Sequence, residues 1–153
     1  MTTNSSESEL RVLVIDDNLD GAISFSYLLQ VIGCRTSTAF GGEMGMRVAQ
    51  LFQPVLVFID LHMPGPDGCE VVGKLREMGG SLSQAICVCL TATGQLDDEP
   101  RCLAAGFDRF LQKPLEPAAL ADLIQLARDR QGPADIAAAA SLPSEGPLDL
   151  ETG

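Results

Sequence analysis

The sequence predicts an α/β fold in which a doubly wound sheet of five parallel strands carries helices on both faces. Short, unbroken apolar runs rich in Val and Ile recur along the chain, and such runs are typical of strands buried on both faces. They alternate with segments whose apolar residues recur at helical spacing, as in right-handed strand–helix–strand crossovers. In the run 55–60, five apolar residues end in Asp60 and turn formers follow, so we place this strand at the centre of the sheet.

Ten elements follow from these patterns. The predicted strands are residues 11–15, 34–38, 55–60, 85–90 and 107–111. The second strand is more polar than the others, so we place it at an edge of the sheet. The predicted helices are residues 19–32, 41–52, 68–78, 97–105 and 117–130.

Capping and breaking residues support the predicted helix ends. Asn18 or Asp20 can cap the first helix, and Asp67 or a neighbour the third. Pro100 fits only in the first turn of its helix. The helices are expected to stop at Gly33, at Pro54, at Gly79-Gly80, at Gly106 and before Gly132. Apolar residues recur at helical spacing in the first helix, at Ile23, Tyr27, Leu28, Val31 and Ile32, and Met44, Val48 and Leu51 fall on one face of the second. In the third helix, Val71, Val72 and Leu75 are expected to face inward.

A length of 153 residues suits one domain, which we expect to span residues 10–131. Residues 1–9 are predicted to be a disordered polar lead-in. Residues 132–153 hold an Ala run, prolines and acids, and are predicted to be a disordered tail. The net charge of −11 argues against nucleic acid as a partner, because an acidic surface repels phosphate backbones.

The chain has no predicted signal peptide or membrane span, because its start is polar and no apolar run approaches the ~18 residues that a span needs. We therefore expect a cytoplasmic protein without a membrane partner. Five cysteines at irregular spacing do not form a disulfide framework. Cys87 and Cys89 share a face of one strand; we interpret them as small buried apolar residues, with a metal pair as the alternative.

Polar residues gather where the predicted strands end. Asp16 and Asp17 follow the first strand, Asp60 the third, Thr91 the fourth and Lys113 the fifth. Ligand crevices of open α/β sheets lie at these carboxyl ends. Converging carboxylates repel one another, and a hard divalent cation such as Mg²⁺ would offset that repulsion.

This set is similar to the receiver domain of two-component response regulators over about residues 10–130. The residues that carry the resemblance are Asp16-Asp17, Asp60, Thr91-Ala92 and Lys113-Pro114, with Thr91 31 residues after Asp60 and Lys113 22 residues further on. The loop 61–68 and the segment 106–114 also look like those of the family. The resemblance implies a flavodoxin-like sheet with strand order 2-1-3-4-5 and five helices.

The resemblance also implies roles for these residues. Asp60 would take a phosphoryl group from a phosphohistidine of a histidine kinase or a histidine phosphotransfer protein. Thr91 and Lys113 would contact the phosphoryl group, and the Lys113-Pro114 bond would be cis. The Mg²⁺ ligands would be Asp16, Asp17, Asp60 and the backbone carbonyl of His62. Thr91 and the aromatic Phe110 would then switch the surface of the fourth helix, fifth strand and fifth helix.

Some features are left open by the resemblance. Phe110 stands where tyrosine is frequent, and His62 is either an exposed loop residue or a group that controls water access to the acyl phosphate. Output would pass through a protein partner, a homodimer or a parent hybrid kinase. One alternative is a phosphorylation-independent scaffold, which predicts a missing site residue, and none is missing. Another is a phosphatase-type enzyme, which normally has a second acid where this chain has His62.

Overall fold

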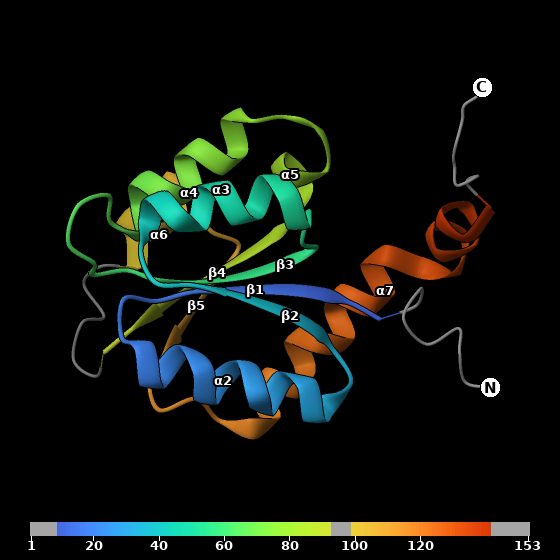
Figure 1. Ribbon diagram of the computed structural model, residues 1–153, viewed down its shortest axis with the longest axis horizontal. Coiled ribbons are helices and arrows are strands. Elements are labelled where there is room, and N and C mark those ends of the chain that lie inside the picture. The colour runs from blue at the N-terminus through green and yellow to red at the C-terminus, as the bar shows by residue number, and fades with distance from the viewer. Residues whose placement is uncertain (1–8, 93–98, 142–153) are drawn as a thin grey trace.

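The computed structural model describes residues 9–92 and 99–141, without the side chains of residues 99 and 131–141. Its five parallel strands form one sheet in the order β2-β1-β3-β4-β5, so the predicted fold class and strand order are confirmed. The helices α3, α4, α5 and α6 cover one face of the sheet, and α2 and α7 cover the other (Figure 1). Of the segments predicted to be disordered, residues 1–8 and 142–153 lie outside the described part, whereas residues 132–141 continue the last helix.

The elements follow the predicted order with small shifts at their ends. The strands are β1 (Arg11–Ile15), β2 (Arg35–Ala39), β3 (Leu56–Asp60), β4 (Ile86–Thr91) and β5 (Arg109–Gln112). The helices are α2 (Leu19–Ile32), α3 (Gly42–Phe52), α4 (Gly68–Glu77), α5 (Gly80–Gln84), α6 (Glu99–Ala105) and α7 (Pro117–Ser141). The fifth strand starts two residues later than predicted, at Arg109, and Phe107 is buried in the core just before it.

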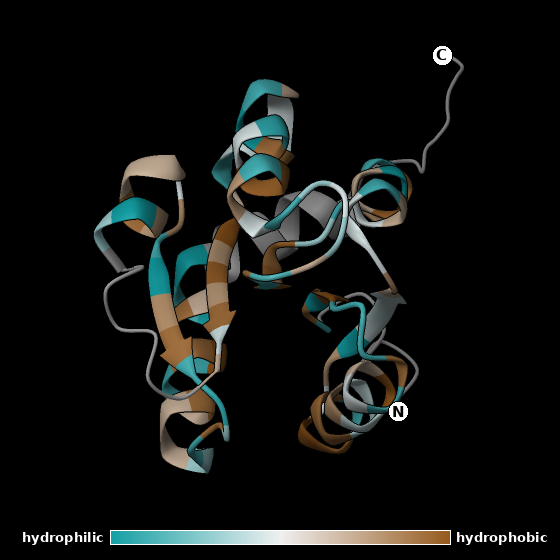
Figure 2. Ribbon diagram, turned by 90° about the vertical axis from the view of Figure 1, so that its left-hand side faces the viewer, coloured by the Kyte–Doolittle hydropathy of each residue, from teal (hydrophilic) through white to brown (hydrophobic). Residues whose placement is uncertain are grey.

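The central strand divides the core into two layers, because successive side chains of a strand point to opposite faces. Val57 and Ile59 belong to the layer under α3, α4 and α6. Leu56 and Phe58 belong to the layer under α2 and α7, where the ring of Phe58 meets that of Phe25 edge to face at 4.8 Å. Brown stretches on the strands in Figure 2 show this apolar interior. The rigid sheet therefore fixes where the strand ends lie.

The prediction of five helices is wrong, since the described residues contain six. The additional helix, α5, starts at Gly80, so the Gly79-Gly80 pair ends one helix and begins another. Both glycines have positive φ, which lets the chain reverse between the two helices. The predicted end of the last helix near residue 130 is also wrong, because α7 continues to Ser141.

The apolar repeat of the first helix is not its buried face. Ala22, Ser26 and Leu29 face the sheet, and the residues of the apolar repeat are exposed: Ile23, Tyr27, Leu28, Val31 and Ile32. Both sets have helical spacing, so periodicity alone does not distinguish them. The small side chains allow close approach to the sheet, and the Ser26 hydroxyl donates to the Thr36 hydroxyl at 2.7 Å.

In the second helix the residues on the apolar face differ in burial. Gly42, Gly45 and Ala49 are buried in α3 and Val48 packs partly buried against the core, whereas Met44 and Leu51 are exposed. A Cβ at Gly45 would come within 2.5 Å of the Ile15 side chain, so only glycine allows α3 to lie this close to the end of β1. The predicted inward face of α4, namely Val71, Val72 and Leu75, is confirmed.

Candidate functional site

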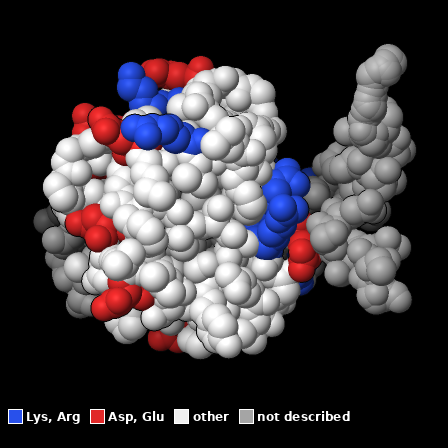
Figure 3. Space-filling model, viewed as in Figure 1, with Lys and Arg blue, Asp and Glu red and all other residues white. Residues whose placement is uncertain are grey.

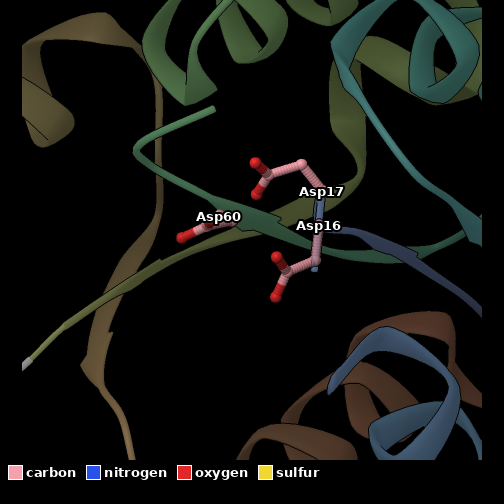
Figure 4. Close-up of side chains that lie close together, drawn as sticks. All are labelled: Asp16, Asp17 and Asp60. Carbon is pink, nitrogen blue, oxygen red and sulfur yellow. The ribbon is translucent and has the colours of Figure 1, made fainter. Parts of the chain in front are cut away.

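Three carboxylates meet where two neighbouring strands end. Asp16 and Asp17 follow β1, and Asp60 is the last residue of the adjacent β3. One oxygen from each lies within 4.8 Å of the others, and Figure 4 shows the three side chains grouped at the strand ends. Parallel pairing of β1 with β3 brings these residues together although more than forty positions separate them in the sequence.

Backbone hydrogen bonds hold Asp16 in place. Its N–H donates to the Ala39 carbonyl at 3.0 Å, which continues the pairing of β1 with β2. Its carboxylate accepts a hydrogen bond from the Asn18 N–H at 3.0 Å. The Asn18 side chain in turn accepts from the Gly21 N–H and caps α2, so of the two predicted caps Asn18 is the one used.

The loop after Asp60 is fixed at both ends. The Leu61 N–H donates to the Leu90 carbonyl at 2.8 Å, and the Gly68 N–H donates to the Leu61 carbonyl at 2.9 Å. A Cβ on Gly68 would lie 2.8 Å from the Asp60 carbonyl oxygen, so glycine is required where α4 starts against the end of β3. Asp67 and Glu70 form a capping box at this helix start, which confirms the predicted cap.

Lys113 brings a positive charge to the carboxylates. Its Nζ lies 3.0 Å from Asp16 Oδ2 and 3.7 Å from Asp60 Oδ1. Its backbone N–H donates to the Thr91 carbonyl at 2.8 Å, and the Lys113-Pro114 bond is cis, as expected. Burial acts to lower the pKa of Lys113. The hydrogen bond to Asp16 and the charge of Asp60 outweigh burial and raise that pKa above the ordinary lysine value.

Asp60 titrates unusually for a carboxylic acid. Burial is the largest cause, and it raises the pKa of Asp60 to about 6. Lys113 opposes this rise, whereas the charges of Asp16 and Asp17 add to it. At pH 7 the ionised form still outnumbers the protonated form by about ten to one, so Asp60 is available as an anion.

The carboxylates and Lys113 share one cavity. It has a volume of about 380 Å³ and is lined by Asp16, Asp17, Asn18, Asp60, His62, Ala92 and Lys113. Of the seven residues singled out from the sequence, five therefore lie around it, and His62 is exposed at its edge. Thr91 is fully buried at the end of β4 and does not line the cavity, and Phe110 is half-buried against the core.

Sequence reasoning missed two residues of the cavity. Asn18 was predicted only as a helix cap, and Ala92 only as the residue after Thr91. Their signal in the sequence is position: each follows directly on a residue at a strand end.

In Figure 3, most acidic groups in view lie on the side where the strands end.

The donor set fits a hard cation. Three carboxylates within 4.8 Å supply only oxygen ligands, the type that Mg²⁺ takes in proteins. A divalent charge would offset the carboxylate repulsion that, together with burial, raises the pKa of Asp60.

No helix within residues 9–92 and 99–141 combines the length and apolarity needed to cross a membrane.

Comparison with known proteins gives consistent matches. The family model described as "Response regulator receiver domain" matches residues 12–125. "Transcriptional regulatory protein PrrA" of Mycobacterium leprae is 33% identical over 144 residues, which cover 94% of this chain and 60% of that protein. "Virulence sensor protein BvgS" of Bordetella bronchiseptica is 31% identical over 147 residues, covering 94% of this chain and 11% of that protein. The chain thus spans less than two thirds of the length of each of these relatives.

Solved structures agree with the observed topology. The chemotaxis protein CheY4 of Vibrio cholerae superposes with a TM-score of 0.71 at 25% identity, over 78% of this chain and 98% of that one. The structure described as "a putative response regulator from Chloroflexus aurantiacus J-10-fl" gives a TM-score of 0.73 at 24% identity, over 80% of this chain and 99% of that one. The second match bears on the fold alone.

Proposed function

Because this chain belongs to the response regulator receiver family of two-component systems, we propose that it is a phosphorylation switch whose phosphoacceptor is Asp60. Receiver domains of this family act as signalling switches and receive phosphoryl groups from histidine kinases. The observation that supports the assignment to Asp60 is its position in one cavity with Lys113 and two further carboxylates.

The proposed reaction transfers a phosphoryl group from a phosphohistidine to Asp60. An ionised Asp60 oxygen attacks phosphorus, the P–N bond breaks as the P–O bond forms, and the imidazole nitrogen keeps the electron pair and takes up a proton. The donor would belong to a histidine kinase or a histidine phosphotransfer protein. The ammonium of Lys113, 3.7 Å from Asp60, is placed to stabilise negative charge on the phosphoryl oxygens.

Mg²⁺ is the proposed cofactor, with Asp16, Asp17 and Asp60 as its carboxylate ligands and the His62 backbone carbonyl as a further oxygen. When bound, it supplies positive charge that offsets the carboxylates and the incoming phosphoryl group. Asp16 also accepts from Lys113 at 3.0 Å, so this residue couples the ammonium to the carboxylate cluster.

Thr91 and Phe110 are the proposed switch residues. Thr91 ends β4 beside the cavity residue Ala92, and its hydroxyl would donate to the phosphoryl group. Phe110 of β5 pairs in register with Cys89 of β4, the strand that ends at Thr91, and its ring is only half-buried against the core. Such a movement would change the surface of α6, β5 and α7, which correspond to the fourth helix, fifth strand and fifth helix of the family pattern.

The route of output is part of this proposal. A protein target, a homodimer or a parent hybrid kinase would recognise the switched surface. His62 would control water access to the acyl phosphate.

We place the protein in the cytoplasm, since all five cysteines are free thiols, as expected for a reducing compartment.

The test is adduct formation by the full chain. Incubation with acetyl phosphate and Mg²⁺ should give one phosphoryl group per chain by intact-mass spectrometry, and EDTA or Asp60→Asn should abolish it. Asp122→Asn, which removes an exposed carboxylate of α7, is the matched control and should leave the adduct intact. Absence of any adduct would favour a phosphorylation-independent scaffold, and release of many phosphates per chain would favour a phosphatase.

A further inference from the structure

Three cysteines from distant parts of the chain lie together on one side of the sheet. Cys89 of β4 and Cys102 of α6 have sulfur atoms 3.3 Å apart, and both side chains are fully buried. Cys69, the second residue of α4, is within hydrogen-bonding reach of Cys102 and is only partly buried. Cys102 therefore lies between a deeply buried thiol and one closer to solvent.

The other two cysteines have different surroundings. The Cys87 thiol contacts the Ala85 carbonyl, and Cys34 lies in the opposite core layer. Among the described residues, the three aspartates alone bring three metal-ligand atoms within 4.8 Å of one another. The geometry of the cysteines thus favours a bond between two sulfurs over a three-ligand metal site.

We propose that Cys89 and Cys102 are a redox modification site, which a hydroperoxide converts to a disulfide that links β4 to α6. The sulfurs need to approach by about 1.2 Å to reach bonding distance, which is about 2.05 Å for a disulfide. Two thiols lose two hydrogens and two electrons, and hydrogen peroxide accepts them to become two molecules of water.

Cys69 provides a route for the oxidant into the core. Peroxide converts the Cys69 thiol to a sulfenic acid and releases water. The Cys102 sulfur then attacks the Cys69 sulfur, which forms a disulfide and releases a second water. Cys89 finally attacks Cys102, forming the Cys89–Cys102 bond and returning Cys69 to a thiol. Burial raises the pKa of Cys69 to about 11, so thiolate is scarce and only strong or prolonged oxidation starts the sequence.

The bond would act where the proposed switch operates. Cys89 stands opposite Phe110 in the pairing of β4 with β5, and both side chains belong to the core layer under α6. A covalent link from β4 to α6 would hold that helix in place while Phe110 changes position. This consequence for signalling rests on the proposed function, whereas formation of the disulfide does not.

The test uses the full chain in its native state. After treatment with hydrogen peroxide, unfolding and alkylation, three of the five thiols should react, because two are joined. Trypsin cleaves after Arg101 and separates Cys102 from Cys89, so the linked peptides should be found in a non-reduced digest and disappear with dithiothreitol. Cys102→Ala should abolish the link, and Cys87→Ala, a change two residues from Cys89, should preserve it.

Several outcomes would overturn the proposal. They are five alkylatable thiols after oxidation, a final bond from Cys69 to Cys102, or links only between separate chains. In the wild-type digest the linked peptide carries both Cys87 and Cys89, so its fragmentation spectrum identifies the joined residue even where a variant fails to fold. Asp60→Asn protein should form the bond as readily as wild type, so failure of the phosphorylation assay and failure of this proposal are distinguishable.

Discussion

Replacing Asp60 with Asn should stabilise the protein against unfolding at neutral pH when divalent cations are absent. The folded protein holds the pKa of Asp60 at about 6, whereas the ordinary value is 3.8. An acid whose pKa is raised by folding favours the protonated form in the folded state. Stability is therefore lost as the pH rises from about 4 to about 6, the loss is complete above about pH 6, and the effect is absent below about pH 4.

The size of the effect follows from the pKa difference. A rise of about two pKa units corresponds to about 3 kcal/mol. Asp60 borders an open cavity, where solvent screens its charge, so we expect about 1 to 2 kcal/mol. Asn is similar in shape and carries no charge at any pH, so Asp60→Asn should gain this amount at about pH 7.5 and almost none at about pH 4.

Urea unfolding with EDTA at these two pH values measures the difference directly. The midpoint of the Asp60→Asn variant should exceed that of wild type at the higher pH, and the gap should close at the lower one. Asp122→Asn should show neither effect. A destabilised Asp60→Asn variant at neutral pH, or a gap independent of pH, would refute the electrostatic argument.

Further substitutions test the rest of the site. Lys113→Met should lower the free energy of unfolding by about 1 kcal/mol at pH 7, because the raised pKa of Lys113 contributes stability at every pH below the ordinary lysine value. The expected loss is small because the Lys113 side chain is 38% exposed and solvent screens its charge. An unchanged urea midpoint would contradict it. Gly68→Ala should cost about 1–3 kcal/mol through contact with the Asp60 carbonyl, whereas Gly73→Ala in the same helix meets nothing and should gain about 0.5–1 kcal/mol, both by thermal unfolding. Equal effects would show that the close approach is not limiting. Asp67→Ala should lose the capping box and about 1 kcal/mol by urea unfolding, and a change below about 0.3 kcal/mol would show that the cap is dispensable.

The sequence predicts the sheet well because strands buried on both faces leave a strong signal. Short unbroken apolar runs, such as the one that ends at Asp60, are typical of strands in a parallel sheet with both faces covered. Asp16 and Asp60 lie close together because β1 and β3 are neighbours in the sheet, and no local sequence pattern connects the two residues. Asp16 and Asp60 follow such runs directly, and Lys113 lies two residues past the predicted fifth strand, so their convergence depends on the sheet.

Helix faces were harder to predict, since α2 is apolar on more than one side. Ala22 and Leu29 face the sheet, while Ile23 is 51% and Val31 is 70% exposed. Which side is buried depends on how closely the helix approaches the sheet, and that is a property of tertiary packing. The contact between Gly45 and Ile15 also depends on tertiary packing. A glycine in a sequence suggests a flexible backbone, but here its missing Cβ allows the helix to pack closely on the strand.

The most direct test of the account is to locate the acyl phosphate itself. The full chain is treated with acetyl phosphate and Mg²⁺ and then reduced with borohydride, which converts an aspartyl phosphate to homoserine. We expect homoserine at position 60 alone in the peptide map. Homoserine at residue 16 or 17 would contradict the assignment of Asp60, as would a phosphoryl group on any other side chain.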